Sequence, residues 1–155
     1  MDLHSEIIIG LKIMIAFLAG GFIGFDRERH GSDAGIRTYA AVCLGATLFT
    51  TIGEHLADIA AASRIIANII VGIGFLGAGV IFKDTTSNSS KGLTTAATVW
   101  CTAAVGVAIG LDMYIIAGVA SFALYFLLSL HHHKWYVKWK TKIRIKNGKG
   151  EGDND

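Results

Sequence analysis

The stretch Asn68-Ile-Ile-Val-Gly-Ile-Gly-Phe-Leu-Gly-Ala-Gly-Val-Ile-Phe82 contains four glycines in fifteen residues, with no charged residue and no proline. On a helix, Gly72 and Gly79 fall on one side, whereas Gly74 and Gly77 fall on the opposite side. In lipid the backbone must form its hydrogen bonds internally, and small residues let neighbouring helices approach closely. The stretch therefore predicts the central helix of a membrane bundle. The literal match to a dinucleotide-binding motif, Gly72-x-Gly-x-x-Gly77, lacks the surrounding βαβ unit and the carboxylate that such a motif requires.

The whole chain has the composition of a membrane protein. Its 155 residues are 52% hydrophobic and include 19 glycines and no proline, and the mean hydropathy is +0.51. These values exclude an ordinary soluble domain and predict one all-α integral membrane domain over residues 1–130. We expect no second domain and no nucleic-acid partner.

Five apolar segments have about the length that a bilayer span requires. Four basic residues of the first and third connectors and seven of the tail fall on one side of the membrane, whereas Arg64 alone falls on the other. The positive-inside rule therefore predicts an external N-terminus and a cytoplasmic C-terminus. The expected segments are roughly Ile7 to Phe25, Ala34 to Gly53, Ser63 to Phe82, Leu93 to Gly110 and Met113 to Leu130.

Residues 131–155 form a basic cytoplasmic tail. Apolar residues such as Trp135, Val137 and Trp139 alternate with lysines, a period that favours a strand over a helix. Two interpretations remain open: an interfacial segment whose aromatic rings lie at headgroup level, and a strand paired with another subunit. The end, Gly148 to Asp155, is expected to be disordered.

Lys12 is the deepest charged residue of the first segment. It shares a helix stripe with Ala16, Gly20 and Ile23, which are the residues expected to pack against protein. A charge at membrane depth needs a partner and commonly has a function. Lys12 either points into the bundle or extends along the helix to the outer surface, and both positions remain open.

Charged residues also gather where the first two segments meet. Asp26 and Arg27 end the first segment, and Arg37 and Thr38 lie near the start of the second. We expect a functional ionic cluster on the cytoplasmic side, in which Asp26 pairs with Arg27 or Arg37. Arg37 is expected about one turn inside the membrane boundary, where a guanidinium needs compensation. The alternative is a set of positive-inside anchors.

Two further polar groups lie on the third and fourth segments. Arg64 and Asn68 are four residues apart and face together on a helix. Thr95 begins a stripe that continues with Thr98 and Thr102. These hydroxyls either bond carbonyls of their own helix or bond across helices.

The sequence contains no motif typical of an enzyme: no Ser-His-Asp set, carboxylate dyad, HExxH or P-loop lysine. We expect neither enzymatic activity nor a bound cofactor or metal. The external face would carry five acids against Arg64, which would concentrate cations and allow transient Mg²⁺ binding.

Small residues are expected to form the helix contacts and to provide a dimer interface. Gly20-x-x-x-Gly24 and Gly106-x-x-x-Gly110 supply more small faces than one five-helix monomer needs, and we therefore predict a homodimer. The glycines predicted to pack are Gly20, Gly24, Gly72, Gly74, Gly77, Gly79 and Gly106.

Four motifs, in order, resemble the membrane domain of the MgtC/SapB/YhiD family over roughly residues 8 to 128. Asp26, Tyr39 and Lys91 depart from the glutamate, histidine and arginine that the family usually has at these positions. The change to lysine keeps the charge but loses bidentate geometry. The motifs are Lys12-x-x-x-Ala-x-x-x-Gly-x-x-Ile-Gly-x-Asp-Arg-Glu28, Ala34-Gly-Ile-Arg-Thr38, Gly72-Ile-Gly-Phe-Leu-Gly-Ala-Gly-Val-Ile81 and Lys91-Gly-Leu-Thr-Thr-Ala-Ala-Thr-Val-Trp100.

The resemblance implies a bacterial inner-membrane protein tied to growth in low magnesium, acid stress or survival inside host cells. It also implies a membrane partner, since MgtC itself is associated with restraining the F-type ATP synthase. Larger members carry a cytoplasmic regulatory domain, whereas only the basic tail follows here. Two hypotheses follow: a non-enzymatic regulator that binds membrane partners, which we favour, and a Mg²⁺ transporter or channel.

Overall fold

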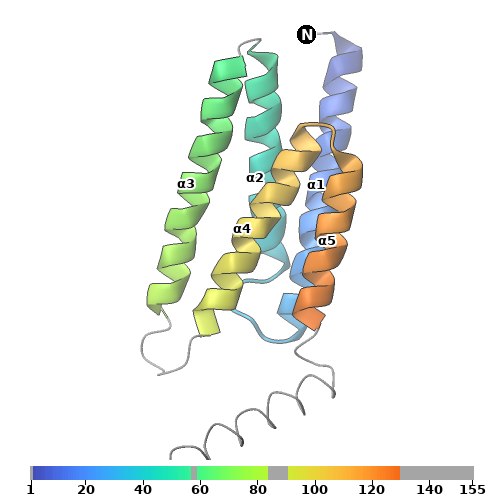
Figure 1. Cartoon of the computed structure of the whole chain (residues 1–155). Coiled ribbons are helices and arrows are strands. Elements are labelled where there is room, and N and C mark those ends of the chain that lie inside the picture. Colours follow the sequence, from blue (N-terminus) through green and yellow to red (C-terminus); the bar gives the residue numbers. More distant parts are fainter. Residues whose placement is uncertain (1, 57–58, 84–90, 130–155) are drawn as a thin grey trace, which may run out of the picture.

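The computed structural model describes residues 2–56, 59–83 and 91–129, which form five α-helices and no strand (Figure 1). The all-α prediction is confirmed. Each helix overlaps one of the predicted segments, and α1 begins and ends about a turn beyond its segment. The helices are α1 (Leu3–Arg29), α2 (Ile36–His55), α3 (Ile59–Lys83), α4 (Lys91–Gly110) and α5 (Tyr114–Ser129).

Four of the five helices, α1 to α4, are long and apolar enough to cross a membrane. The fifth, α5, is apolar but has 16 residues, which corresponds to about 24 Å at 1.5 Å per residue. The prediction of five spans of similar length is therefore met by four helices, with a shorter fifth. The direction in which the chain crosses the membrane stays a prediction.

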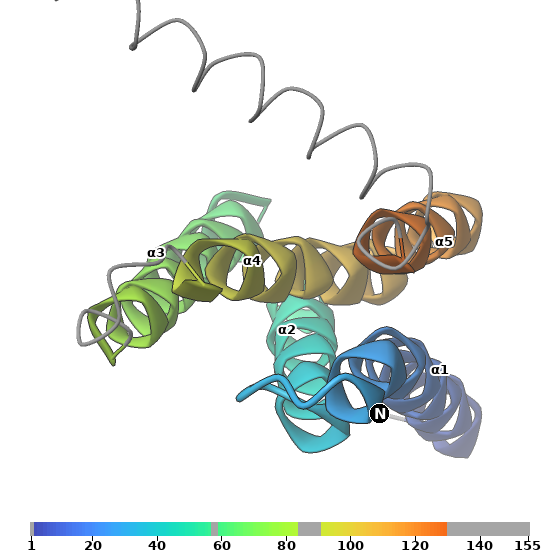
Figure 2. The same cartoon turned by 90° about the horizontal axis from the view of Figure 1, so that it is seen from below.

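Helix α4 is the centre of the bundle, because it packs against each of the other four helices (Figures 1 and 2). Helix α3 lies at the edge, and among the described helices it packs only against α2 and α4. In the apolar window of α4, 61% of the residues are buried, compared with 6% in α3. The prediction that the glycine-rich third helix is central is therefore wrong.

Glycine contacts explain why α4 rather than α3 is central. A Cβ atom at Gly106 would collide with the carbonyl of Cys43 in α2, and one at Gly20 would lie 2.5 Å from the Tyr39 carbonyl. In α3, only a Cβ at Gly77 would meet a neighbour, 3.5 Å from the Cβ of Ala96. Glycine therefore brings α1, α2 and α4 together, whereas the other glycines of α3, Gly72, Gly74 and Gly79, would meet nothing within 4 Å.

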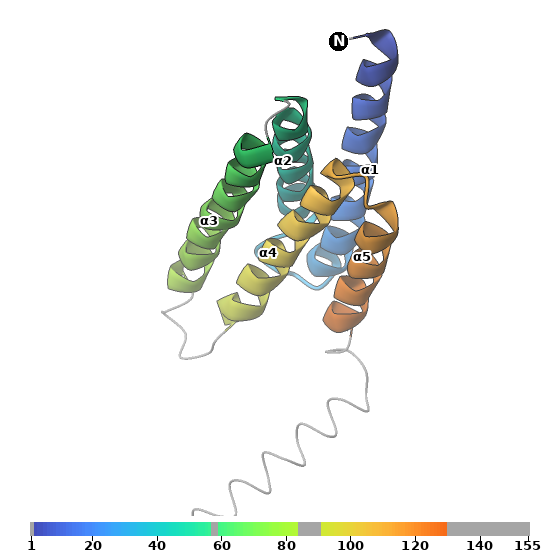
Figure 3. The same ribbon diagram turned by 45° about the horizontal axis from the view of Figure 1, so that its top comes forward.

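The core lies where α1, α2 and α4 meet, and α5 closes it on one side (Figure 3). Ile23, Tyr39 and Ile109 are fully buried there. On the α5 side, the rings of Phe22 and Tyr125 stack with their centroids 4.7 Å apart. This packing fixes the position of α1 along the neighbouring helices. Helix α1 carries two charged side chains, Lys12 and Arg27, that lie at different heights in the bundle.

Candidate functional site

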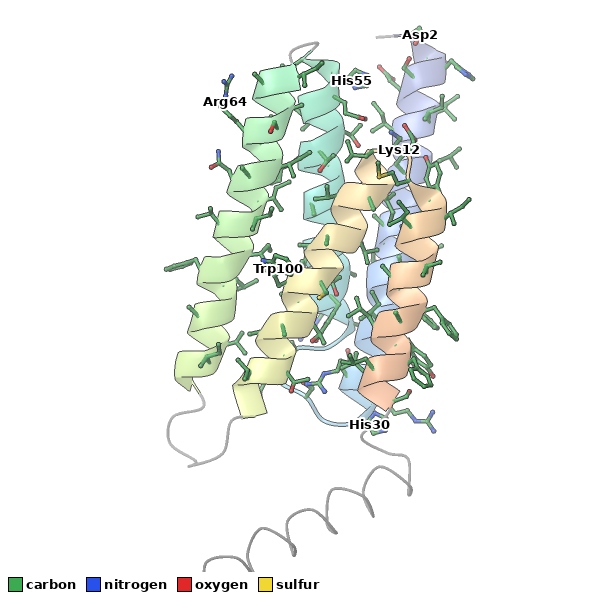
Figure 4. All side chains as sticks on the ribbon, viewed as in Figure 1. Asp2, Lys12, His30, His55, Arg64 and Trp100 are labelled. Carbon is green, nitrogen blue, oxygen red and sulfur yellow. The ribbon has the colours of Figure 1, made fainter. Side chains whose placement is uncertain are left out.

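One polar cluster lies where α1 meets the turn between α4 and α5, near the top of Figure 4. Lys12 is only 5% exposed, and its Nζ donates hydrogen bonds to the Gly110 carbonyl and to Asp112 Oδ2, both at 2.8 Å. Glu54 Oε2 of α2 lies 3.7 Å from the same nitrogen. We call Lys12, Glu54, Asp112 and Tyr114 the upper cluster.

Asp112 is held in place by the turn and by two donors. Its φ of 60° lies in the left-handed region, which a short polar side chain tolerates better than a branched one. The Tyr114 hydroxyl donates to Asp112 Oδ1 at 2.7 Å, while Lys12 donates to the other oxygen. The hydrogen bond from Lys12 is the main cause that lowers the pKa of Asp112 below its usual 3.8.

The upper cluster decides between the two positions left open for Lys12, since the side chain points into the bundle. Its ammonium also lies at the C-terminal end of α4, where the helix dipole favours a cation. The sequence placed Glu54 and Asp112 on the external face without connecting them to Lys12. Little in the sequence connects them, because both acids are distant from Lys12 in the chain and Lys12 was expected deeper in the membrane.

Hydroxyl groups line the contact between α2 and α4 below this cluster. Thr47 donates to the Gly106 carbonyl at 2.7 Å, and the Tyr39 and Thr98 hydroxyls lie 2.6 Å apart. Thr98 and Thr102 also bond carbonyls one turn earlier in α4. Both predicted modes, within the helix and across helices, are therefore present.

A second polar cluster lies where α1 ends, at the opposite end of the bundle. Arg27 Nη2 donates to Ser32 Oγ and to Thr95 Oγ1 of α4, both at 2.7 Å, and the Arg27 Nε is buried without a partner among the described residues. Asp26 is 7% exposed, and its Oδ1 lies 3.6 Å from His30 Nδ1. We call Asp26, Arg27, His30, Ser32 and Thr95 the lower cluster.

The pairing predicted for Asp26 is wrong, because no ion pair joins it to Arg27 or Arg37 within the described residues. The backbone geometry explains the difference. His30 ends α1 one turn after Asp26 and also bonds its carbonyl oxygen through Nδ1, at 2.6 Å. Arg37 lies in the first turn of α2, and its side chain is exposed. Its expected depth inside the membrane boundary stays a prediction. His30 and Ser32 were missed because short-range loop contacts carry little signal in a sequence.

The remaining predicted residues are spread around these clusters. Thr38 is partly buried in α2, and Arg64 and Asn68 are exposed on α3. Asn68 lies in an apolar groove of about 490 Å³ between α2 and α3. Glu28 accepts a hydrogen bond from the Ile36 backbone N–H at 2.8 Å, which caps the start of α2.

A metal centre is not built into the described part of the chain, where no three His, Cys, Asp or Glu side chains come close enough to hold an ion. The two acids of the upper cluster already face an ammonium group. Residues 131–155, with both interpretations of the tail, lie outside the described residues. Cys43 and Cys101 are free thiols, and Cys43 is buried.

Comparison with known proteins places these features in a family. The MgtC of Brucella abortus is 45% identical over 106 residues, which cover 68% of this chain and 44% of that protein. The chain is 34% identical to SrpB of Synechococcus elongatus, with 94% of this chain and 93% of that protein covered.

The chain is also 35% identical to the Escherichia coli K12 protein named "Putative magnesium transporter YhiD", over 79% of this chain and 60% of that protein. No solved structure matches. The family model described as MgtC matches residues 13–134. This multi-pass membrane chain therefore belongs to the MgtC family.

Proposed function

We propose that this chain is a non-enzymatic regulator in the bacterial inner membrane, active in magnesium homeostasis or stress adaptation. The observation that carries the proposal is the separation of the two polar clusters. Lys12 lies nine residues after the start of α1, and Arg27 lies two residues before its end, about 22 Å away along the helix at 1.5 Å per residue. Between them the described core consists of packed apolar residues and of hydroxyls that are bonded, apart from that of Thr50.

The charges of the two clusters support regulation rather than transport. The most buried charged group of the upper cluster is the ammonium of Lys12. In the lower cluster the carboxylate of Asp26 is buried, and the guanidinium of Arg27 accompanies it. Mg²⁺ binds carboxylates and keeps its waters, and it is repelled by fixed cations. A path along this interior would bring the ion past Ile23 and Ile109, which are fully buried and apolar. The buried hydroxyls of Tyr39, Thr47 and Thr98 are already bonded to other protein atoms.

A regulator acts through partners, and the bundle offers apolar faces for them. Ile115 and Phe122 of α5 are 84% and 68% exposed, and Phe75 of α3 is 84% exposed. In a bilayer these faces meet lipid or the helices of another protein. The F-type ATP synthase, the partner that the family resemblance implies, stays a prediction.

A second candidate is a Mg²⁺ transporter or channel. The name of YhiD supports this function, and so does Thr50, a residue 1% exposed whose hydroxyl has no partner among the described residues. Thr50 lies one turn below Glu54 on α2, so a cation that displaced Lys12 would find another oxygen beneath the upper cluster.

Flux through purified protein separates the two functions. The chain is reconstituted in liposomes that hold a Mg²⁺-sensitive dye, and external Mg²⁺ is added with and without a membrane potential. The regulator predicts a rate equal to that of empty liposomes, and an ionophore added last checks that the dye responds. A protein-dependent rate that falls in Glu54→Gln would establish transport and end the regulator proposal.

A further inference from the structure

The groove between α2 and α3 has free space beside a glycine of each helix. Gly45 lies on the α2 wall and Gly72 on the α3 wall, and a Cβ atom at either position would meet nothing within 4 Å. The volume of about 490 Å³ therefore borders two stretches of bare backbone. Glycine weakens an isolated helix, and in lipid it is useful where another backbone approaches.

Asn68 is the polar residue of this groove, whose nine other lining residues are apolar or glycine. Its side chain is exposed, and no hydrogen bond joins it to another described residue. It lies nine residues after the start of α3, or about 14 Å along the helix, in a hydrocarbon layer about 30 Å thick. Lipid tails offer this amide no donor and no acceptor, so its position requires a protein partner.

We propose that this groove binds a second copy of the chain, with α3 packed along α3 of the copy. Two copies that insert in the same direction are related by a twofold axis perpendicular to the membrane. The two α3 helices are then parallel, and residues at equal depth meet. Asn68 meets its own copy, and because an amide both donates and accepts, the pair satisfies itself. A single Asn at a helix interface also fixes the register.

The spacing along α3 fits such a pair. Asn68, Gly72, Phe75 and Gly79 follow one another at intervals of four, three and four residues, the repeat of a parallel two-helix seam. Phe75 is 84% exposed and lies between two glycines, neither of which has a neighbour within 4 Å of a Cβ. Each ring therefore fills the space beside the glycines of the other copy.

This interface replaces the one expected from the sequence. The pairs Gly20 with Gly24 and Gly106 with Gly110 are occupied inside the monomer, because a Cβ at any of these positions would lie within 2.8 Å of an α2 atom. They have no surface left for a second copy. The homodimer stays a prediction, and its seam moves to α3.

Site-specific cross-linking tests the seam in the full chain, reconstituted in nanodiscs of phosphatidylethanolamine and phosphatidylglycerol. In a background with Cys43→Ala and Cys101→Ala, Phe75→Cys is oxidised and compared with Phe122→Cys of α5. The two phenylalanines are both exposed, and they lie eight and seven residues from the lower ends of their helices. We expect a disulfide-linked dimer from Phe75→Cys and at least tenfold less from Phe122→Cys.

The amide pair is tested by the dissociation constant of the dimer. Asn68→Leu should raise it about fivefold, since one interhelical polar contact in a membrane contributes roughly 1 kcal/mol, whereas Asn68→Gln should keep most of the affinity. Neither variant should change the unfolding midpoint of the monomer, because Asn68 bonds no described residue.

Three results would overturn the proposal: cross-linking through Phe122→Cys instead of Phe75→Cys, a monomer at every concentration with lipid retained in the groove, and cross-linking of Phe75→Cys in cells only to a different protein. The Mg²⁺ flux result affects none of these outcomes, so the two proposals fail separately.

Discussion

Helices α3 and α4 are both glycine-containing and apolar, yet α4 is the centre of the bundle and α3 is its edge. The difference lies in what the glycines face. Gly106 and Gly110 of α4 lie against α2, whereas Gly72 and Gly74 of α3 have open space beside them. In addition, α1 side chains bind both ends of α4, because Lys12 bonds Gly110 and Arg27 bonds Thr95. A glycine-rich helix is therefore able to pack closely, but its neighbours decide whether it does so within the chain.

The largest effect should come from filling the contact of α4. Gly106→Leu places a side chain where the Cys43 carbonyl lies, and overpacking of this kind costs about 3 kcal/mol or more. We expect loss of the folded protein from the membrane fraction. The matched variant in α3 is Gly74→Leu, which meets open space and should leave the yield and the unfolding midpoint unchanged. Equal losses in both variants would mean that α3 is as enclosed as α4.

Removal of the ammonium group at the upper end of α4 should have the next largest effect. Lys12→Met keeps most of the side-chain volume but removes the hydrogen bonds to Gly110 and Asp112. Breaking a buried ion pair costs about 3 to 5 kcal/mol, and because both carboxylates are more than one third exposed we expect about 2 kcal/mol. Unfolding in mixed micelles with rising SDS measures it. A stability equal to wild type would show that α4 does not depend on this attachment.

The lower attachment of α4 should matter less, since Arg27 binds hydroxyl groups rather than carboxylates. Arg27→Met removes the bonds to Ser32 and Thr95, and we expect a loss of about 1 kcal/mol by the same SDS titration. Arg37 provides the control, because it is exposed in the first turn of α2. Arg37→Met should change stability by less than about 0.5 kcal/mol. The reverse order would restore the predicted pairing of Arg37 with Asp26.

The helices were predictable from the sequence to a large extent, whereas their neighbours were not. Apolar length and connectors identified all five helices, and the stripe of Lys12 indicated a packed face but left the position of the Lys12 ammonium open. The helix period tells which residues share a face, but not which helix covers that face, so the central position was assigned to α3. Packing glycines look alike in a sequence whether a Cβ would meet a backbone, as at Gly106, or open space, as at Gly79.

The polar clusters were predictable only in part, for a related reason. Lys12 and Arg27 were identified because charges stand out in apolar segments. Their partners come from other helices or turns: Asp112 is 100 residues away from Lys12 in the chain, and Thr95 is 68 residues away from Arg27. Only the arrangement of the bundle brings these residues together.

The smallest effect should be a pH dependence confined to the upper attachment of α4. Lys12 holds the pKa of Asp112 below its usual 3.8 in the folded chain, so the charged carboxylate stabilises the fold at neutral pH. This contribution is complete above the unfolded value of 3.8, and it is lost as the pH falls from there through the lowered pKa. Stability measured between pH 6 and pH 2 should therefore decrease less steeply in Asp112→Asn than in wild type. Lys12→Met should also flatten the curve, but less than Asp112→Asn, because the Tyr114 hydroxyl still lowers the pKa of Asp112. Parallel curves for wild type and both variants would show that the pair contributes nothing to stability. Arg27→Met should keep the full slope, because the lower attachment contains no carboxylate bonded to Arg27.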